Sequence, residues 1–202
     1  MTDCGCHVEP TTESVEERKA ITIALALNFT MFVVGVTAGL IANSSGLLAD
    51  ALDMLSDSLA YIIALVAIGR SGRFKSNAAT LSGGILAVLG IGVLIDTVRR
   101  ALGGEAPLGW IMVASGTASL IVNATVLRML AKFREGDVHL RASWIFTRAD
   151  VIANVGVIIA AVLVMITRSN IPDTVIGLAI GAYVVKEALE ILREARAEGA
   201  RT

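Results

Sequence analysis

Four aspartates lie within long apolar segments of the sequence, where a charged side chain is costly and usually functional. Asp50, Asp53 and Asp57 are spaced three and four residues apart. On a helix, at about 100° per residue, this spacing places the three carboxylates within about 60° of one another, on a single face. Asp150 lies in a later apolar segment, and Asn154 follows it by one helical turn. The spacing therefore predicts that polar groups from two helices face each other inside an apolar surrounding.

The expected depths of these groups in a membrane are similar. If the two helices enter from opposite faces, Asp57 and Asp150 lie about 16 Å and about 15 Å from their own faces, at about 1.5 Å per residue. Asp53 then comes level with Asn154. Three carboxylates at one depth can bind a divalent cation through oxygen ligands. Because metal binding to such groups displaces protons, the pattern indicates exchange of a divalent metal ion for protons.

The composition of the whole chain predicts that these residues lie in a membrane protein. Of the 202 residues, 55% are apolar and only 17% are charged, and the mean hydropathy is +0.74. A soluble surface needs roughly a quarter or more of charged residues, so a soluble globular enzyme is excluded. The formal net charge of -1 excludes the basic surface of a nucleic-acid-binding protein. We therefore expect the lipid bilayer, and no nucleic acid, as a partner.

Uncharged runs divide the chain into six predicted transmembrane helices, because about 20 apolar residues cross the hydrocarbon layer. A polar turn at residues 43–46 separates the first two helices. The sixth has only 12 uncharged residues and must extend across Lys186 and Glu187. The fold is thus predicted to be an all-α integral membrane protein. Its predicted helices are 20–42, 46–69, 76–95, 106–127, 140–167 and 174–189.

The distribution of basic residues predicts the orientation of the bundle. Thirteen of them flank the side that holds both termini, and three lie in the opposite loops. Cytoplasmic loops carry the excess of Lys and Arg, so we expect both termini in the cytoplasm and the chain in the cell (inner) membrane. The predicted organisation is a cytoplasmic tail over residues 1–19, a six-helix domain over 20–192 and a short cytoplasmic tail over 193–202, with no C-terminal domain.

Three sequence segments carry a resemblance to a known family. They are SGLLADALDMLSD at 45–57, LRASWIFTRAD at 140–150 and PDTVIG at 172–177. The first resembles a helix-two signature in which His or Asp is followed four residues later by Asp. The second and third resemble a helix-five signature and the start of helix six. Together they resemble the cation diffusion facilitators, a family of six-helix divalent metal/proton antiporters, over roughly residues 20–195.

The resemblance implies that Asp53, Asp57 and Asp150 are ligands of a transport site. Phe146 stands where the family usually has His, so one ligand is missing, and Asn154 or water is the candidate to complete the shell. Losing an imidazole weakens the preference for zinc over harder ions. On family frequency zinc remains the first expectation, with cobalt, cadmium, nickel, manganese and iron as alternatives.

The resemblance also implies a transporter with no permanent cofactor and no enzymatic activity, since the divalent metal is its substrate. Most family members continue into a cytosolic ferredoxin-like domain that this sequence does not show. We therefore expect a homodimer formed through transmembrane helices. Two other classes stay open, namely a passive divalent-cation channel and a membrane-embedded metalloenzyme that uses the same carboxylates.

Two smaller groups of residues complete the sequence-based predictions. Cys4, Cys6 and His7 offer two thiolates and an imidazole near the N-terminus, and such ligands suit zinc. They are a candidate for metal capture on the cytoplasmic side, with an incidental grouping in a tail as the alternative. Asp50 lies near the start of its helix and is a candidate for an outer access or supporting role.

Overall fold

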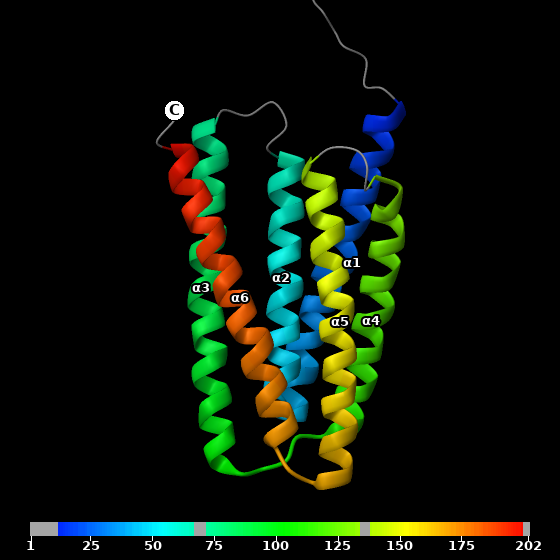
Figure 1. The fold of residues 1–202 in the computed structure, drawn as a ribbon, viewed down its shortest axis with the longest axis vertical. Coiled ribbons are helices and arrows are strands. Elements are labelled where there is room, and N and C mark those ends of the chain that lie inside the picture. The colour runs from blue at the N-terminus through cyan, green and yellow to red at the C-terminus, as the bar shows by residue number, and fades with distance from the viewer. Residues whose placement is uncertain (1–11, 67–71, 134–137, 200–202) are drawn as a thin grey trace, which may run out of the picture.

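The computed structural model describes residues 12–66, 72–133 and 138–199. In this part of the chain all regular structure is helical, as the sequence predicts. Six long helices form one bundle (Figure 1). They are α1 (Thr12–Ala42), α2 (Ser45–Val66), α3 (Gly72–Gly103), α4 (Gly109–Leu130), α5 (Val138–Thr167) and α6 (Ile171–Gly199), with a short 3-10 helix η1 (Ala131–Phe133) after α4.

Several helices are longer than the apolar runs from which they were predicted. α1 begins at Thr12 rather than near residue 20, and α6 continues to Gly199 rather than ending near residue 189. The first extension is rich in Glu, Arg and Lys and the second in Glu, Arg and Ala, and all of these are good helix formers. The residues assigned to tails at 12–19 and 193–199 are therefore continuations of α1 and α6.

Within the described residues, four of the six helices contain a stretch that is long and apolar enough to cross a membrane. These stretches are Val15–Ala42, Ser76–Gly103, Gly109–Leu130 and Thr147–Thr167, in α1, α3, α4 and α5. Their outward side chains are apolar and exposed, for example Val88 and Ile166, as expected for contact with lipid. In α2 three aspartates interrupt the apolar sequence, and in α6 several charged residues do so. Within a membrane these side chains must be shielded by neighbouring helices.

α2 is shielded by the other helices, because it lies at the centre of the bundle. It contacts every other long helix, and it packs most extensively against α1 and α6. Figure 1 shows α3 and α6 side by side, with α2 between this pair and the group formed by α1, α4 and α5. The core around α2 contains Leu47 and Leu52 of α2, Met112 of α4, Val157 of α5 and Val184 of α6.

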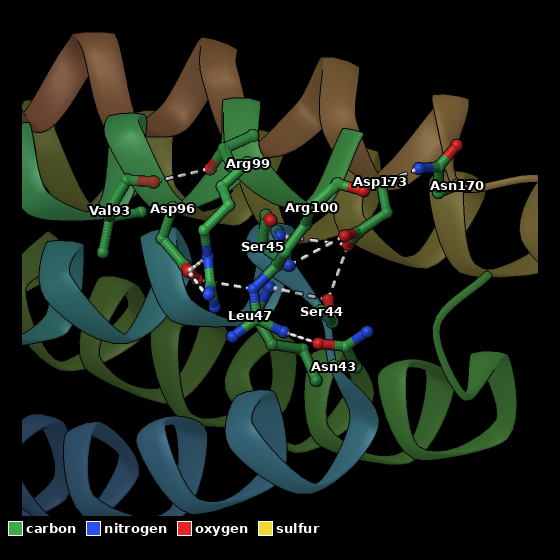
Figure 2. A network of polar contacts seen from close by, with 12 residues as sticks. Asn43, Ser44, Ser45, Leu47, Val93, Asp96, Arg99, Arg100, Asn170 and Asp173 are labelled. Atoms are coloured by element: carbon green, nitrogen blue, oxygen red, sulfur yellow. Dashed lines mark hydrogen bonds and ion pairs between the residues drawn. The ribbon is translucent and has the colours of Figure 1, made fainter. Parts of the chain in front are cut away.

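Hydrogen bonds join the N-terminal end of α6 to the start of α2 (Figure 2). The carboxylate of Asp173 accepts hydrogen bonds from Ser44 Oγ at 2.5 Å, from the Ser45 backbone N–H at 2.7 Å and from the Gly46 backbone N–H at 3.0 Å. A negative charge at a helix N-terminus is stabilising, because the first N–H groups of a helix have no partner within it. Asp173 therefore caps α2 from a helix that follows it by more than a hundred residues.

An arginine at the C-terminal end of α3 extends this network. Arg100 Nε donates to Asp96 Oδ2 at 2.5 Å, and Arg100 Nη1 donates to the side-chain oxygen of Asn43 in the tight turn between α1 and α2. Asn170 Nδ2 donates to the backbone oxygens of Arg100 and Ala101 at 3.1 and 3.2 Å. The contacts join α3 and α6 to the α1–α2 turn at the end of the bundle opposite the chain termini.

Candidate metal site

The structure brings Asp53 and Asp57 of α2 together with Asp150 of α5. Asp53 and Asp150 are 7% and 3% exposed, and Asp57 is partly buried. The side chain of Asp150 interacts with those of both Asp53 and Asp57. The two helices that the sequence motifs single out thus place their carboxylates in one buried cluster, which we call the carboxylate cluster.

Close packing on the opposite side of α2 orients its aspartates toward α5. Gly35 of α1 leaves only 3.0 Å between an added Cβ and that of Ala51, and Gly39 leaves 2.9 Å to the side chain of Leu48. Ala51 and Leu48 lie away from the aspartate face of α2 at about 100° per residue. Small residues let helix backbones approach closely in a membrane, so the two glycines allow α1 to cover the apolar face of α2.

One oxygen of the carboxylate cluster has no hydrogen-bond donor. Asp150 Oδ2 is buried and unpaired in the described part of the structure. Buried polar atoms are nearly always hydrogen-bonded, and each exception needs an explanation such as a bound ion, a water molecule or a chemical role. Among the described residues, however, no three His, Cys, Asp or Glu side chains surround one point closely enough to hold a metal ion. Because carboxylates repel one another, a bound cation is what would draw three of them around one point.

Asp50 belongs to a separate hydrogen-bond network. It is 2% exposed and accepts hydrogen bonds from Ser119 Oγ at 2.9 Å and from Asn154 Nδ2 at 2.5 Å. The side-chain oxygen of Asn154 in turn accepts a hydrogen bond from Asn123 Nδ2 at 3.0 Å. The network links α2, α5 and α4, and it uses both ends of the Asn154 amide. A ligand role for Asn154, like the outer-access role of Asp50, stays a prediction.

Glu187 lies near the candidate site, although none of the sequence motifs includes it. Its carboxylate accepts a hydrogen bond from Ser56 Oγ at 2.9 Å, next to Asp57, and it interacts electrostatically with the carboxylate cluster. The sequence did contain a signal for this position. Small or apolar residues occupy positions 177, 180, 181, 184 and 188, and this helical repeat, which the structure buries, includes position 187 on the same face.

Other predicted residues lie outside what the structure describes. Cys4, Cys6 and His7 precede the first described residue, and Phe146 lies in α5 but its side chain is not described. Their predicted roles in metal capture and selectivity therefore stay predictions.

Comparison with known proteins agrees with the family resemblance that the sequence motifs carry. The family described as "Cation efflux transmembrane domain" matches residues 21–198. The chain is 26% identical over 187 residues to the metal cation efflux system protein CzcD of Cupriavidus metallidurans, covering 87% of this chain and 59% of that protein. It is also 26% identical over 189 residues to the zinc transporter ZitB of Yersinia pestis, covering 87% of this chain and 61% of that protein.

A third relative, the zinc transporter ZitB of Pectobacterium atrosepticum, is 26% identical over 202 residues, covering 93% of this chain and 62% of that protein. The chain thus spans about three fifths of the length of the curated relatives that it matches. The family match includes α2, α5 and α6, whose motifs gave the resemblance, and it covers most of the chain. The chain belongs to the cation efflux transmembrane domain family, that of the cation diffusion facilitators.

Proposed function

We propose that the protein is a secondary active transporter that exports divalent transition-metal cations from the cytoplasm in exchange for protons. The observation that carries this proposal is the carboxylate cluster, in which three aspartates from α2 and α5 interact inside an apolar helix bundle. Intramembrane acidic residues mark ion pathways and proton relays. The names of the relatives, a metal cation efflux protein and two zinc transporters, support a metal ion as the substrate.

In this proposal Asp53, Asp57 and Asp150 bind the transported ion. Fully ionised, the three carboxylates carry three negative charges, and one divalent ion reduces the net charge of the site to -1. Zinc is the first candidate, and cobalt, cadmium, nickel, manganese and iron are alternatives. An oxygen-rich site accepts the harder ions among these more readily than a site that contains imidazole.

Protons leave and enter the same carboxylates in the exchange step. Metal ligands must be deprotonated, so metal binding and proton release are linked at equilibrium. After the ion leaves toward the opposite face, proton uptake by the aspartates returns the site to a state that is stable without metal. This linkage needs no residue beyond the carboxylate cluster, and it distinguishes an antiporter from a passive channel.

The arrangement of the helices supports the proposed orientation. The start of α1 and the end of α6 lie at the same end of the bundle (Figure 1), as an even number of spans requires. The excess of basic residues at that end supports placing it in the cytoplasm, with the bundle in the inner membrane. A homodimer through transmembrane helices, and metal capture by Cys4, Cys6 and His7, belong to the same proposal.

The test is metal flux in proteoliposomes that contain the purified chain. We expect an acidic lumen to drive uptake of Zn²⁺, Co²⁺ or Mn²⁺ from the outer solution, with alkalinisation of the lumen. Asp57→Asn removes one carboxylate of the cluster and should abolish both signals. Asp96→Asn is the matched control, because Asp96 pairs with Arg99 and Arg100 away from the cluster, and it should transport normally.

Two results would contradict the proposal. Metal uptake that proceeds without consuming the pH gradient would favour the passive channel. Normal flux in Asp57→Asn would place the metal site elsewhere.

A further inference from the structure

α6 places one acidic side chain, that of Glu187, against the carboxylate cluster. The residue is partly buried where α6 packs on α2. Ser56 Oγ donates to Glu187 Oε2 at 2.9 Å, and Ser56 is the immediate neighbour of Asp57 in the sequence. The contact holds the Glu187 carboxylate against α2, one residue along the helix from Asp57.

The negative charge of Glu187 acts on every member of the cluster. Its carboxylate interacts electrostatically with Asp53, Asp57 and Asp150. α6 therefore contributes a charge to the surroundings of the cluster, although the aspartates themselves come from α2 and α5.

No basic side chain of the described part of the chain neutralises this charge through an ion pair. Lys186, the nearest in sequence, pairs with Glu190 at 3.4 Å, where both side chains are exposed. Buried charges in proteins are paired or coordinate metal ions. Four carboxylates without an ion-paired lysine or arginine therefore require a cation or protons from outside the chain.

A separate observation favours a ligand at the cluster. Asp150 is 3% exposed, the charge of Glu187 acts on it, and its Oδ2 atom has no hydrogen-bond donor in the described part of the structure. Ser56 donates to only one oxygen of Glu187, Oε2. We therefore assign the other oxygen, Oε1, to the bound cation.

We propose that Glu187 is a fourth carboxylate of the transport site and binds the transported divalent cation beside Asp57. This inference rests on the proposed function. The site then draws on α2, α5 and α6, and its ligands are all oxygens. Such a set suits manganese and other hard divalent ions as well as zinc.

The experiment measures Zn²⁺ and Mn²⁺ binding to the purified full chain by isothermal titration calorimetry. Glu187→Gln is nearly isosteric, and its side-chain oxygen still accepts the Ser56 hydrogen bond. We expect affinity for both ions to fall roughly 10- to 100-fold or more, the loss typical of removing a group that supports a metal site. Glu190→Gln, one turn further along α6 and exposed, is the matched control and should bind as the wild type does.

Thermal unfolding separates binding from structure. In metal-free buffer, Glu187→Gln should unfold at the wild-type temperature or above it, since it removes a repelling charge and keeps the Ser56 contact. Added metal should raise the unfolding temperature of the wild type much more than that of the variant. A purely structural role for Glu187 would lower the metal-free temperature and leave the metal-induced rise unchanged, and that result would overturn the inference.

Asp57→Asn distinguishes this inference from the proposed function. If Asp57→Asn loses metal binding and Glu187→Gln keeps wild-type affinity, the inference is wrong and the proposed function stands. If the wild type binds neither ion, both are wrong.

Discussion

Replacing Asp173 by alanine tests whether α6 holds the N-terminus of α2. Asp173 accepts hydrogen bonds from Ser44 Oγ and from the backbone N–H groups of Ser45 and Gly46. All three donors belong to buried residues, and Asp173 itself is 3% exposed. In Asp173→Ala all three donors lose their acceptor at once. The first turn of α2 also loses the negative charge that complements its dipole.

The magnitude of the effect follows from these contacts. A buried donor without an acceptor costs about 1 to 3 kcal/mol, and the loss of the charge at the helix N-terminus costs about 0.3 to 1 kcal/mol more. The network lies near the end of the bundle, so water can replace part of what is lost, and the lower values apply. We expect a loss of about 3 kcal/mol in the free energy of unfolding, or roughly 6 to 12 °C in Tm for a chain of this size.

The assay is thermal unfolding of the purified chain in one detergent at one heating rate, because the Tm of a protein that unfolds irreversibly depends on scan rate. Asp173→Asn keeps an acceptor oxygen and should show a smaller loss. Thr174→Ala is the matched control, since Thr174 Oγ1 donates only within its own helix, to the Asn170 backbone oxygen at 3.0 Å. Equal Tm values for Asp173→Ala and Thr174→Ala would refute the capping role.

Two further predictions concern packing and selectivity. In Gly177→Ala the new Cβ would lie 2.9 Å from Ser45 Cβ and 3.1 Å from Gly46 N, so we expect a loss of about 1 to 3 kcal/mol in thermal unfolding. Gly84→Ala meets nothing within 4 Å and should leave the Tm unchanged or raised. Phe146→His supplies the imidazole that the family usually has, and we expect it to raise affinity for Zn²⁺ relative to Mn²⁺. A competition series of Zn, Cd, Co, Ni, Mn and Fe checks this, and an unchanged order of affinity would count against the assigned position.

The helices and the pairing of α2 with α5 could be predicted because their signals are local. An apolar run of about 20 residues predicts a helix of membrane length, and a spacing of three and four residues places Asp50, Asp53 and Asp57 on one face. Opposite entry of the two helices then gives a common depth to Asp57 and Asp150. None of these steps needs the packing of side chains.

The helix ends and the tertiary contacts could not be predicted in the same way. An apolar run measures the hydrocarbon-facing part of a helix, whereas charged residues with high helix propensity extend α1 and α6 beyond it. The cap on α2 joins residues 44–46 to Asp173, so it depends on how the chain folds back. The uncharged run of the sixth span ends at Val185, so the sequence shows Glu187 only as part of the extension of a short span, although the inward repeat of α6 continues through it.

The buried aspartates fall into two groups by their surroundings. Some accept hydrogen bonds from donors of the fold, and the others lie against further carboxylates. Asp173 receives three donors and Asp50 receives two, so the network around each stabilises a charge at a fixed place. Asp150 instead meets two other carboxylates and keeps an oxygen without a donor. Donors that are built into the fold satisfy the oxygens of Asp50 and Asp173, whereas repulsion among the carboxylates of the cluster is relieved by a cation or by protons. The proposed exchange of a cation for protons therefore involves Asp53, Asp57 and Asp150, while the hydrogen bonds of Asp50 and Asp173 hold the helix that carries them.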